Sequence, residues 1–173
     1  MTRAQSPEKP SHSVWEHWID SKSDDPAPDE GDMYLQDNGD VLEKGTQKHP
    51  ETGEEVGYEE LWTELEVDVI PEEGGKYSTV LKHESENSRG MVVRVGGWCQ
   101  GVLKEGGQLT VERWRWASQE NDPHQGPGYW KRIVRIGEGE MPSPMLERGG
   151  EDGDEMVVKS GELRWEVVED YRW

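Results

Sequence analysis

The sequence has no phenylalanine, a single cysteine and few hydrophobic residues. Because Cys99 is the only cysteine among 173 residues, an intramolecular disulfide and a zinc site built from several cysteines of one chain are excluded. Hydrophobic residues make up 31% of the chain, and no apolar run reaches the roughly 18 residues of a transmembrane helix. The first residues lack the apolar stretch of a secretory signal. We therefore expect an intracellular protein, located in the cytoplasm, with the nucleus as an alternative.

Positive charge is also scarce. The chain has 19 Lys and Arg against 38 Asp and Glu, which gives a formal net charge of −19. The field of such a protein repels phosphate backbones and anionic lipid surfaces, so we expect neither nucleic acid nor a membrane as a partner. A protein partner remains open.

Residues 89–116 carry the clearest structural pattern of the chain. Two apolar runs are separated by paired glycines, and strict alternation then leads to Trp114 and Trp116. Glycine turns between alternating segments indicate a β-meander. The pattern returns in residues 129–137 and in a closing hairpin over 155–170. About eight to ten short strands with Gly-marked turns predict an all-β fold, an antiparallel barrel or sandwich.

The first part of the chain is polar and acidic. Residues 1–11 contain two prolines and predict a disordered tail. Structure is expected from His12, in a strand that alternates through the segment SVWEHWID. A short helix is expected further on, because four apolar residues follow the spacing i, i+3, i+4, i+7, namely Tyr58, Leu61, Trp62 and Leu65.

Three sequence blocks, taken together, resemble one known family. They are WEHWIDSKS with EKGTQKHPETGEEVGYEELW, then RGMVVRVGGWCQGVLKEGGQLTVERWRW, and finally VKSGELRWEVVED. In this order they resemble the fungal Hri-one family of calycin-like proteins with two β-barrels. The resemblance implies an intracellular protein and supplies no agreed catalytic residues.

The resemblance also implies a domain arrangement. Family members have a long N-terminal segment that supplies most strands of a first barrel, and here a few polar residues stand in its place. We therefore expect a calycin-like antiparallel β-barrel with a decorated N-terminal arm: a tail at 1–11, the remnant of a first barrel at 12–76, and the C-terminal β-barrel at 77–173. Strands of the remnant that lack a partner would have to dock, either onto the barrel or onto a second copy of the chain in a homodimer.

Motifs for metal or cofactor binding are absent from the sequence. There is no phosphate-binding glycine loop, and the acidic clusters lack the spacing of an EF-hand. The five histidines never take the spacing of a zinc motif. We expect no metal site and no cofactor. Cys99, in an apolar strand, is expected to be a buried inert thiol.

The meander supplies the candidate ligand site. Alternation places Thr110, Glu112, Trp114 and Trp116 on one face of their strand. Inside a barrel, Glu112 paired with Arg94 or Arg135 would orient a polar group of a ligand, whereas outside it the same residues would form ordinary cross-strand ion pairs. The candidate ligand-binding residues are Arg94, Trp98, Trp114 and Trp116.

Glu112 and His17 are the candidate catalytic residues. His17 lies between two tryptophans and is either a general base in an apolar cleft or a packed, hydrogen-bonded histidine. A barrel of this size can enclose one ligand, so we expect a protein that binds a small apolar molecule or a protein partner. The alternative is a cofactor-independent cyclase or isomerase that acts on an intermediate of fungal secondary metabolism.

Overall fold

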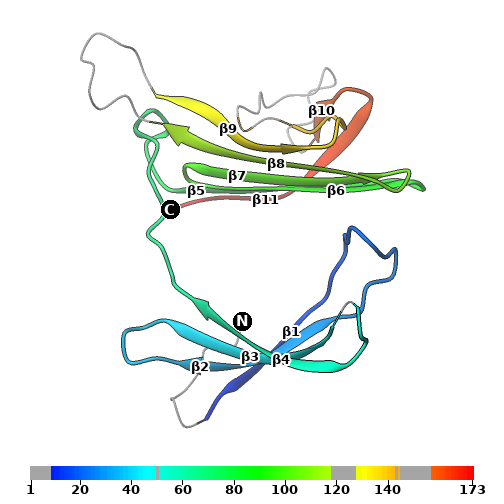
Figure 1. Ribbon diagram of the computed structural model, residues 1–173. Coiled ribbons are helices and arrows are strands. Elements are labelled where there is room, and N and C mark those ends of the chain that lie inside the picture. The colour runs from blue at the N-terminus through cyan, green and yellow to red at the C-terminus, as the bar shows by residue number, and fades with distance from the viewer. Residues whose placement is uncertain (1–8, 50, 118–127, 143, 145–156) are drawn as a thin grey trace. The chain divides into compact units, whose positions relative to one another are not determined.

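The structure is a computed structural model that describes residues 9–49, 51–117, 128–142, 144 and 157–173. These residues form antiparallel strands, connecting segments and one short 3-10 turn at Pro71–Glu73, which confirms the all-β prediction. The chain divides into two compact units, Met1–Glu66 and Val67–Trp173 (Figure 1). Within the described ranges, no helix is long and apolar enough to cross a membrane. The loop expected at 117–128 lies outside the described residues, apart from its two end residues.

The first unit contains one twisted four-stranded antiparallel sheet, in the order β1-β2-β3-β4. Strand β1 begins one residue before the expected His12, and the turn between β2 and β3 uses Gly39 at a φ of 91°, as its Asn-Gly sequence predicts. The expected tail at 1–11 lies outside the described residues as far as residue 8. The strands are β1 (Ser11–Trp15), β2 (Asp29–Leu35), β3 (Val41–Lys48) and β4 (Glu55–Trp62).

The short helix predicted around Tyr58 is wrong, because this segment is strand β4. Tyr58 and Trp62 share one face of β4, and both donate hydrogen bonds to Glu43 on β3. A spacing of four residues places two side chains on the same face of a helix and of a strand alike. Leu61, on the opposite face, is 62% exposed, and Leu65 beyond the strand is 81% exposed.

The second unit contains a seven-stranded antiparallel sheet that curls into a half-barrel (Figure 1). Its order is β10-β11-β5-β6-β7-β8-β9, so β6 to β8 form the meander predicted over residues 89–116, and β10 and β11 form the predicted closing hairpin. β9 and β10 are the two edges of the curl. The strands are β5 (Tyr77–Glu84), β6 (Ser88–Val95), β7 (Trp98–Glu105), β8 (Gln108–Ala117), β9 (Tyr129–Ile136), β10 (Val157–Ser160) and β11 (Leu163–Arg172).

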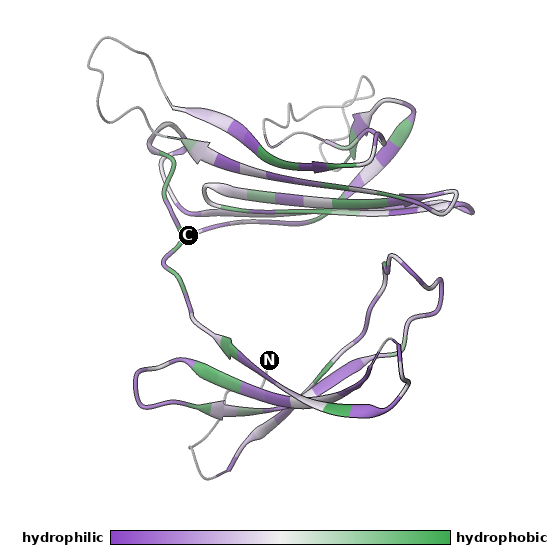
Figure 2. Ribbon diagram, viewed as in Figure 1, coloured by the Kyte–Doolittle hydropathy of each residue, from purple (hydrophilic) through white to green (hydrophobic). Residues whose placement is uncertain are grey.

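The hydrophobic core lies on the concave face of this sheet. Leu81, Leu103 and Trp165 have no exposed surface, and Val167 is also buried. The apolar patterns of the meander and the closing hairpin predict six core residues: Val93, Val95, Val102, Leu103, Trp165 and Val167. The prediction is confirmed for Leu103, Trp165 and Val167. The same prediction is wrong for three valines. Hydrophilic and hydrophobic residues alternate along parts of the sheet (Figure 2), and successive side chains of a strand point to opposite faces. Because Val92, Arg94 and Leu103 are buried on the concave face, the residues next to them along the strands point outward: Val93, Val95 and Val102.

The chain that follows β9 turns onto the concave face. Gly137 takes a φ of 75°, which favours glycine, and the Gly139 amide then donates to the Thr110 hydroxyl at 2.8 Å. Met141 is buried next to Gly101, whose missing side chain leaves room for the Met141 sulfur. Residues 137–142 therefore fill the inside of the curl instead of extending along its edge.

Candidate functional site

Arg94 of β6 is a buried cation, with 6% of its surface exposed. Its Nη2 donates to both carboxylate oxygens of Glu73 at 2.5 Å, and its Nη1 donates to the Pro144 carbonyl at 3.1 Å. The guanidinium Cζ lies 4.9 Å from the ring centre of Tyr77 and 4.8 Å from that of Trp130. A buried arginine is stable only when it is paired in this way. Arg94 thus ties the turn before β5 and the segment after β9 to the sheet.

Glu112 of β8 is a buried carboxylate, with 5% of its surface exposed. It accepts hydrogen bonds from Arg135, from Arg132 at 3.2 Å and from the Trp114 indole at 2.8 Å. Both arginines belong to β9, so the carboxylate fastens this edge strand to β8. Of the two partners predicted for Glu112, Arg135 is the observed one. The pairing with Arg94 is wrong, because Arg94 binds Glu73.

Cys99 of β7 lies opposite Arg94 of β6 on one side and opposite Trp114 of β8 on the other. The thiol is buried, as predicted. Burial raises its pKa to about 12, while the charge of Arg94 lowers the pKa and that of Glu112 raises it. A thiol with such a pKa stays protonated at neutral pH and is a poor nucleophile.

The four tryptophans of the meander and β9 lie on both faces of the sheet. Trp114 and Trp116 face the concave side, where Trp116 meets Trp130 edge to face, with 5.7 Å between ring centres. Trp98 is on the opposite, convex side, where the Arg115 guanidinium lies 4.9 Å from its ring centre. The expectation that Trp98 shares a pocket with Trp114 is therefore wrong, since strand alternation separates them.

His17 lies in the first unit and is separate from the residues of the meander. Strand β1 ends at Trp15, so His17 is not on a strand, and its side chain is exposed. Its Nδ1 lies 3.1 Å from the Ala27 carbonyl oxygen. The expected strand position in an apolar cleft is wrong, because the chain leaves the sheet two residues earlier. The two candidate catalytic residues, Glu112 and His17, thus belong to different units.

Glu43 of β3 is a buried carboxylate that the sequence analysis did not identify. It is 2% exposed and accepts hydrogen bonds from the Tyr58 hydroxyl at 2.8 Å and the Trp62 indole at 2.7 Å. Burial, followed by hydrogen bonds to Glu43 and Asp29, raises the pKa of Tyr58. The alternation of β4, read as a strand, is the signal that would have placed both aromatic rings over Glu43.

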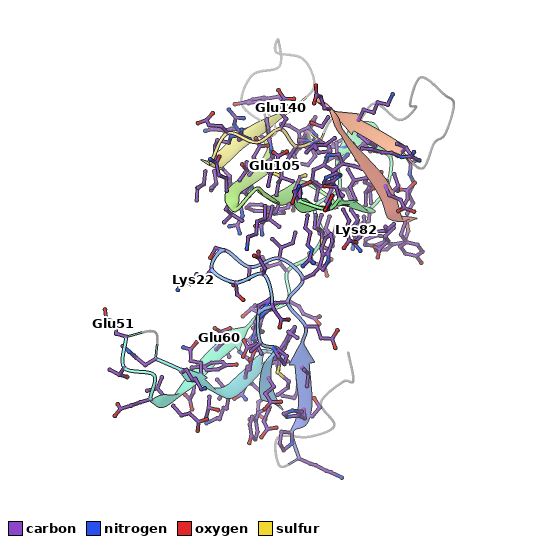
Figure 3. The ribbon with its side chains drawn as sticks, turned by 90° about the vertical axis from the view of Figure 1, so that its right-hand side faces the viewer. Lys22, Glu51, Glu60, Lys82, Glu105 and Glu140 are labelled. Atoms are coloured by element: carbon purple, nitrogen blue, oxygen red, sulfur yellow. The ribbon has the colours of Figure 1, made fainter. Side chains whose placement is uncertain are left out.

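Side chains occupy the inside of the curled sheet, as the sticks in Figure 3 illustrate. Trp165 packs against Gly90 at one end, Met141 fills the middle against Gly101 and Val92, and Arg94 closes the other end. The polar groups of Glu112 are all engaged within the protein. Among the described residues, no cluster of His, Cys, Asp or Glu is arranged to hold a metal ion. The arrangement on this face is that of a packed core.

The opposite face of β6 to β9 differs from the rest of the molecule in charge. These four strands contain eight Lys or Arg residues and two Asp or Glu residues, and of the two acids Glu112 points inward while Glu105 is the last residue of β7. The outward-facing side of β6 to β9 therefore carries an excess of cations, one of which, Arg89, lies 4.0 Å from Glu84 of the neighbouring strand β5. We call it the convex face, with its cations Arg89, Lys104, Arg113, Arg115 and Lys131.

The centre of the convex face is apolar. Rows of side chains run across the register, from Met91 through Val102 and Val111 to Ile136. Several apolar side chains of the convex face are accessible to solvent: Val93 and Val134 are 37% exposed, Trp98 is 38% exposed and Ile136 is 58% exposed. An apolar centre with a charged rim is the usual composition of a protein–protein interface.

Comparisons with known proteins agree with this architecture. A crystal structure of the uncharacterized protein YLR301w from Saccharomyces cerevisiae matches with a TM-score of 0.63 and 22% sequence identity, over 92% of this chain and 70% of that one. At this identity the likeness shows the fold alone. No curated protein matches the chain. The family described as Protein HRI1 matches residues 1–169, which confirms the resemblance seen in the three sequence blocks. The chain belongs to the Protein HRI1 family.

Proposed function

We propose that this protein is a binding protein that recognises an acidic protein partner through the convex face. The observation that carries the proposal is the charge of this face in a molecule of net charge −19. The excess of cations over carboxylates on this face steers an acidic surface towards it, and the apolar centre contributes affinity once water is displaced.

Nucleic acid fits the convex face less well than an acidic protein. Single-stranded nucleic acid is held by a series of aromatic rings on which bases stack. Among the described residues, the convex face offers two aromatic rings, Trp98 and Tyr129, near one end, and its centre is aliphatic.

The predictions of a small apolar ligand and of cyclase or isomerase activity receive less support. Both need space on the concave face, where Met141 and Trp165 are packed against the sheet. Glu112 would be the acid or base of the enzyme, yet its oxygens already accept hydrogen bonds from three side chains. A buried carboxylate bound in this way serves to hold β9 in place.

The proposal is tested with a labelled random copolymer of glutamate and tyrosine, an acidic polypeptide that also offers apolar contacts. Fluorescence anisotropy measures its affinity for the full chain. Replacing Arg113 and Arg115 by Glu is expected to weaken binding by about tenfold or more, because both cations lie on the convex face. Raising the salt concentration should weaken binding as well.

Matched controls are available in the first unit. Lys22, which projects from a loop in Figure 3, and Lys48 on β3 are exposed, so their replacement by Glu changes the net charge equally without altering the convex face. This double variant should bind within about twofold of the unaltered protein. Equal losses in both variants, or tighter binding of a polyuridine RNA than of the copolymer, would contradict the proposal.

A further inference from the structure

Strand β9 leaves one of its edges without a partner strand. It is the last strand of the sheet order and pairs with β8 only, as far as the described residues show. The described residues 137–142 do not run along the free edge, because Gly137 turns the chain inward and Met141 is buried on the concave face. An edge of this kind presents backbone amides and carbonyls that a further strand can pair with.

The side chains of β9 combine exposed apolar groups with positive charge. Tyr129 is 49%, Ile133 45% and Ile136 58% exposed. The strand YWKRIVRI contains three cations and no acid. Two of the cations, Arg132 and Arg135, share the single carboxylate of Glu112, which leaves β9 with an excess of positive charge.

The ladder between β8 and β9 contains one irregularity. Val134 lies opposite Arg113 and Arg132 lies opposite Trp114, so Ile133 is an extra residue in β9. Bulges and basic residues are known devices that keep an edge strand from pairing with a copy of itself. A pair of β9 strands would bring six cations and no acid together, which is unfavourable. A second copy of this strand is thus a poor occupant of the edge.

We propose that the free edge of β9 accepts an extended segment of the partner protein in which acidic and apolar residues alternate. This inference rests on the proposed function and adds its mode of binding: the partner segment pairs with β9 as an eighth strand of the sheet. Main-chain hydrogen bonds provide affinity, while carboxylates next to the β9 cations and apolar side chains next to Ile136 provide selectivity.

The test uses a labelled, end-capped peptide of alternating glutamate and valine, and the same peptide with N-methyl groups on its central amides. The two peptides have equal charge, but only the first can donate main-chain hydrogen bonds from its central amides. We expect the methylated peptide to bind the full chain about tenfold more weakly or worse. Hydrogen exchange should also show that the unmethylated peptide protects amides within residues 129–136, while other segments change little.

The outcomes separate this inference from the proposed function. If both peptides bind equally well, or if residues 129–136 gain no protection, strand addition is wrong, although an acidic ligand still binds the convex face. If neither peptide binds at millimolar concentration while the glutamate–tyrosine copolymer does, strand addition is again wrong and the proposed function stands. Loss of copolymer binding as well would overturn both. Lys131→Glu should weaken the binding of the unmethylated peptide about tenfold. Lys22→Glu should leave the affinity for this peptide within about twofold of that of the unaltered protein.

Discussion

At the scale of single residues, Glu112 and Glu43 are both buried carboxylates, but the charges of their partners differ. Glu112 binds two arginines, and Glu43 binds two neutral donors. Glu112→Gln removes the charge that Arg132 and Arg135 share. Because these arginines are 47% and 27% exposed, we expect a loss of about 1–3 kcal/mol in the free energy of unfolding, less than for a fully buried pair.

The control for this substitution lies in the same sheet. Glu84 is 3.0 Å from Lys82 at an exposed site, and Glu84→Gln should change the free energy of unfolding by no more than about 1 kcal/mol. Urea titrations followed by tryptophan fluorescence compare the two variants. Equal effects would show that Glu112 does not hold β9 in place.

Cys99 gives a prediction about reactivity and pH. Its pKa is about 12 in the folded protein, against an ordinary value of 9.0, because the thiol is buried. Iodoacetamide at pH 8 should leave native Cys99 unmodified and alkylate it after unfolding in guanidinium chloride. Mass spectrometry distinguishes the two results, and rapid alkylation of the native protein would contradict the buried position.

The sign of the pH effect follows from linkage. A folded-state pKa above the unfolded value means that the folded protein retains the proton more strongly. The stability contributed by the protonated thiol is therefore fully present below about pH 9 and is lost as the pH rises towards 12. Cys99→Ala removes this titration, so the stability of the variant should fall less steeply over this range than that of the unaltered protein.

At the scale of the elements, two glycines on adjacent strands of the first sheet have different surroundings. A methyl group on Gly45 of β3 would overlap the ring of Tyr58, whereas on Gly57 of β4 its closest neighbour would be 3.9 Å away. Gly45→Ala should displace Tyr58 from Glu43 and increase amide exchange in β3 and β4. Gly57→Ala is the control and should leave exchange unchanged or slower. Similar exchange in both variants would contradict the role of Tyr58.

Periodicity predicted the meander and the closing hairpin correctly, because period-two alternation and glycine turns coincide there. It failed for β4, since Tyr58 and Trp62 share a face in either structure. Alternation placed Glu112 on the same face as Trp114 but left open whether this face is the inside of the curled sheet. It did not identify Glu73 as the partner of Arg94, because Glu73 lies on a turn outside the meander and only the fold brings the two together. Contacts between distant segments are not encoded in local spacing.

At the scale of the whole molecule, charge is distributed unevenly along the chain. Residues 1–66 contain five Lys or Arg and 18 Asp or Glu, a net charge of −13, whereas residues 67–173 contain 14 and 20, a net charge of −6. The homodimer expected from the sequence remains a prediction. Light scattering tests it, and an association driven by complementary charge should weaken as the salt concentration rises.

Buried apolar surface is distributed as unevenly as charge. Every residue of the hydrophobic core cluster belongs to residues 67–173, and in the described part of residues 1–66 only Gly31 and Glu43 are buried. Apolar burial is the main favourable term in folding, and like charges in a compact unit oppose it. We therefore expect the sheet of β1 to β4 to unfold before the half-barrel.

Calorimetry should accordingly record two transitions, and hydrogen exchange should be faster in residues 9–49 than in β5 to β8. Added salt screens the repulsion among carboxylates, so sodium chloride at about 0.5 M should raise the midpoint of the first transition more than that of the second. Sodium sulfate, which strengthens apolar burial in general, serves as the comparison and should raise both midpoints. A single transition with uniform protection across both units would show that residues 1–66 derive their stability from a source other than their own core.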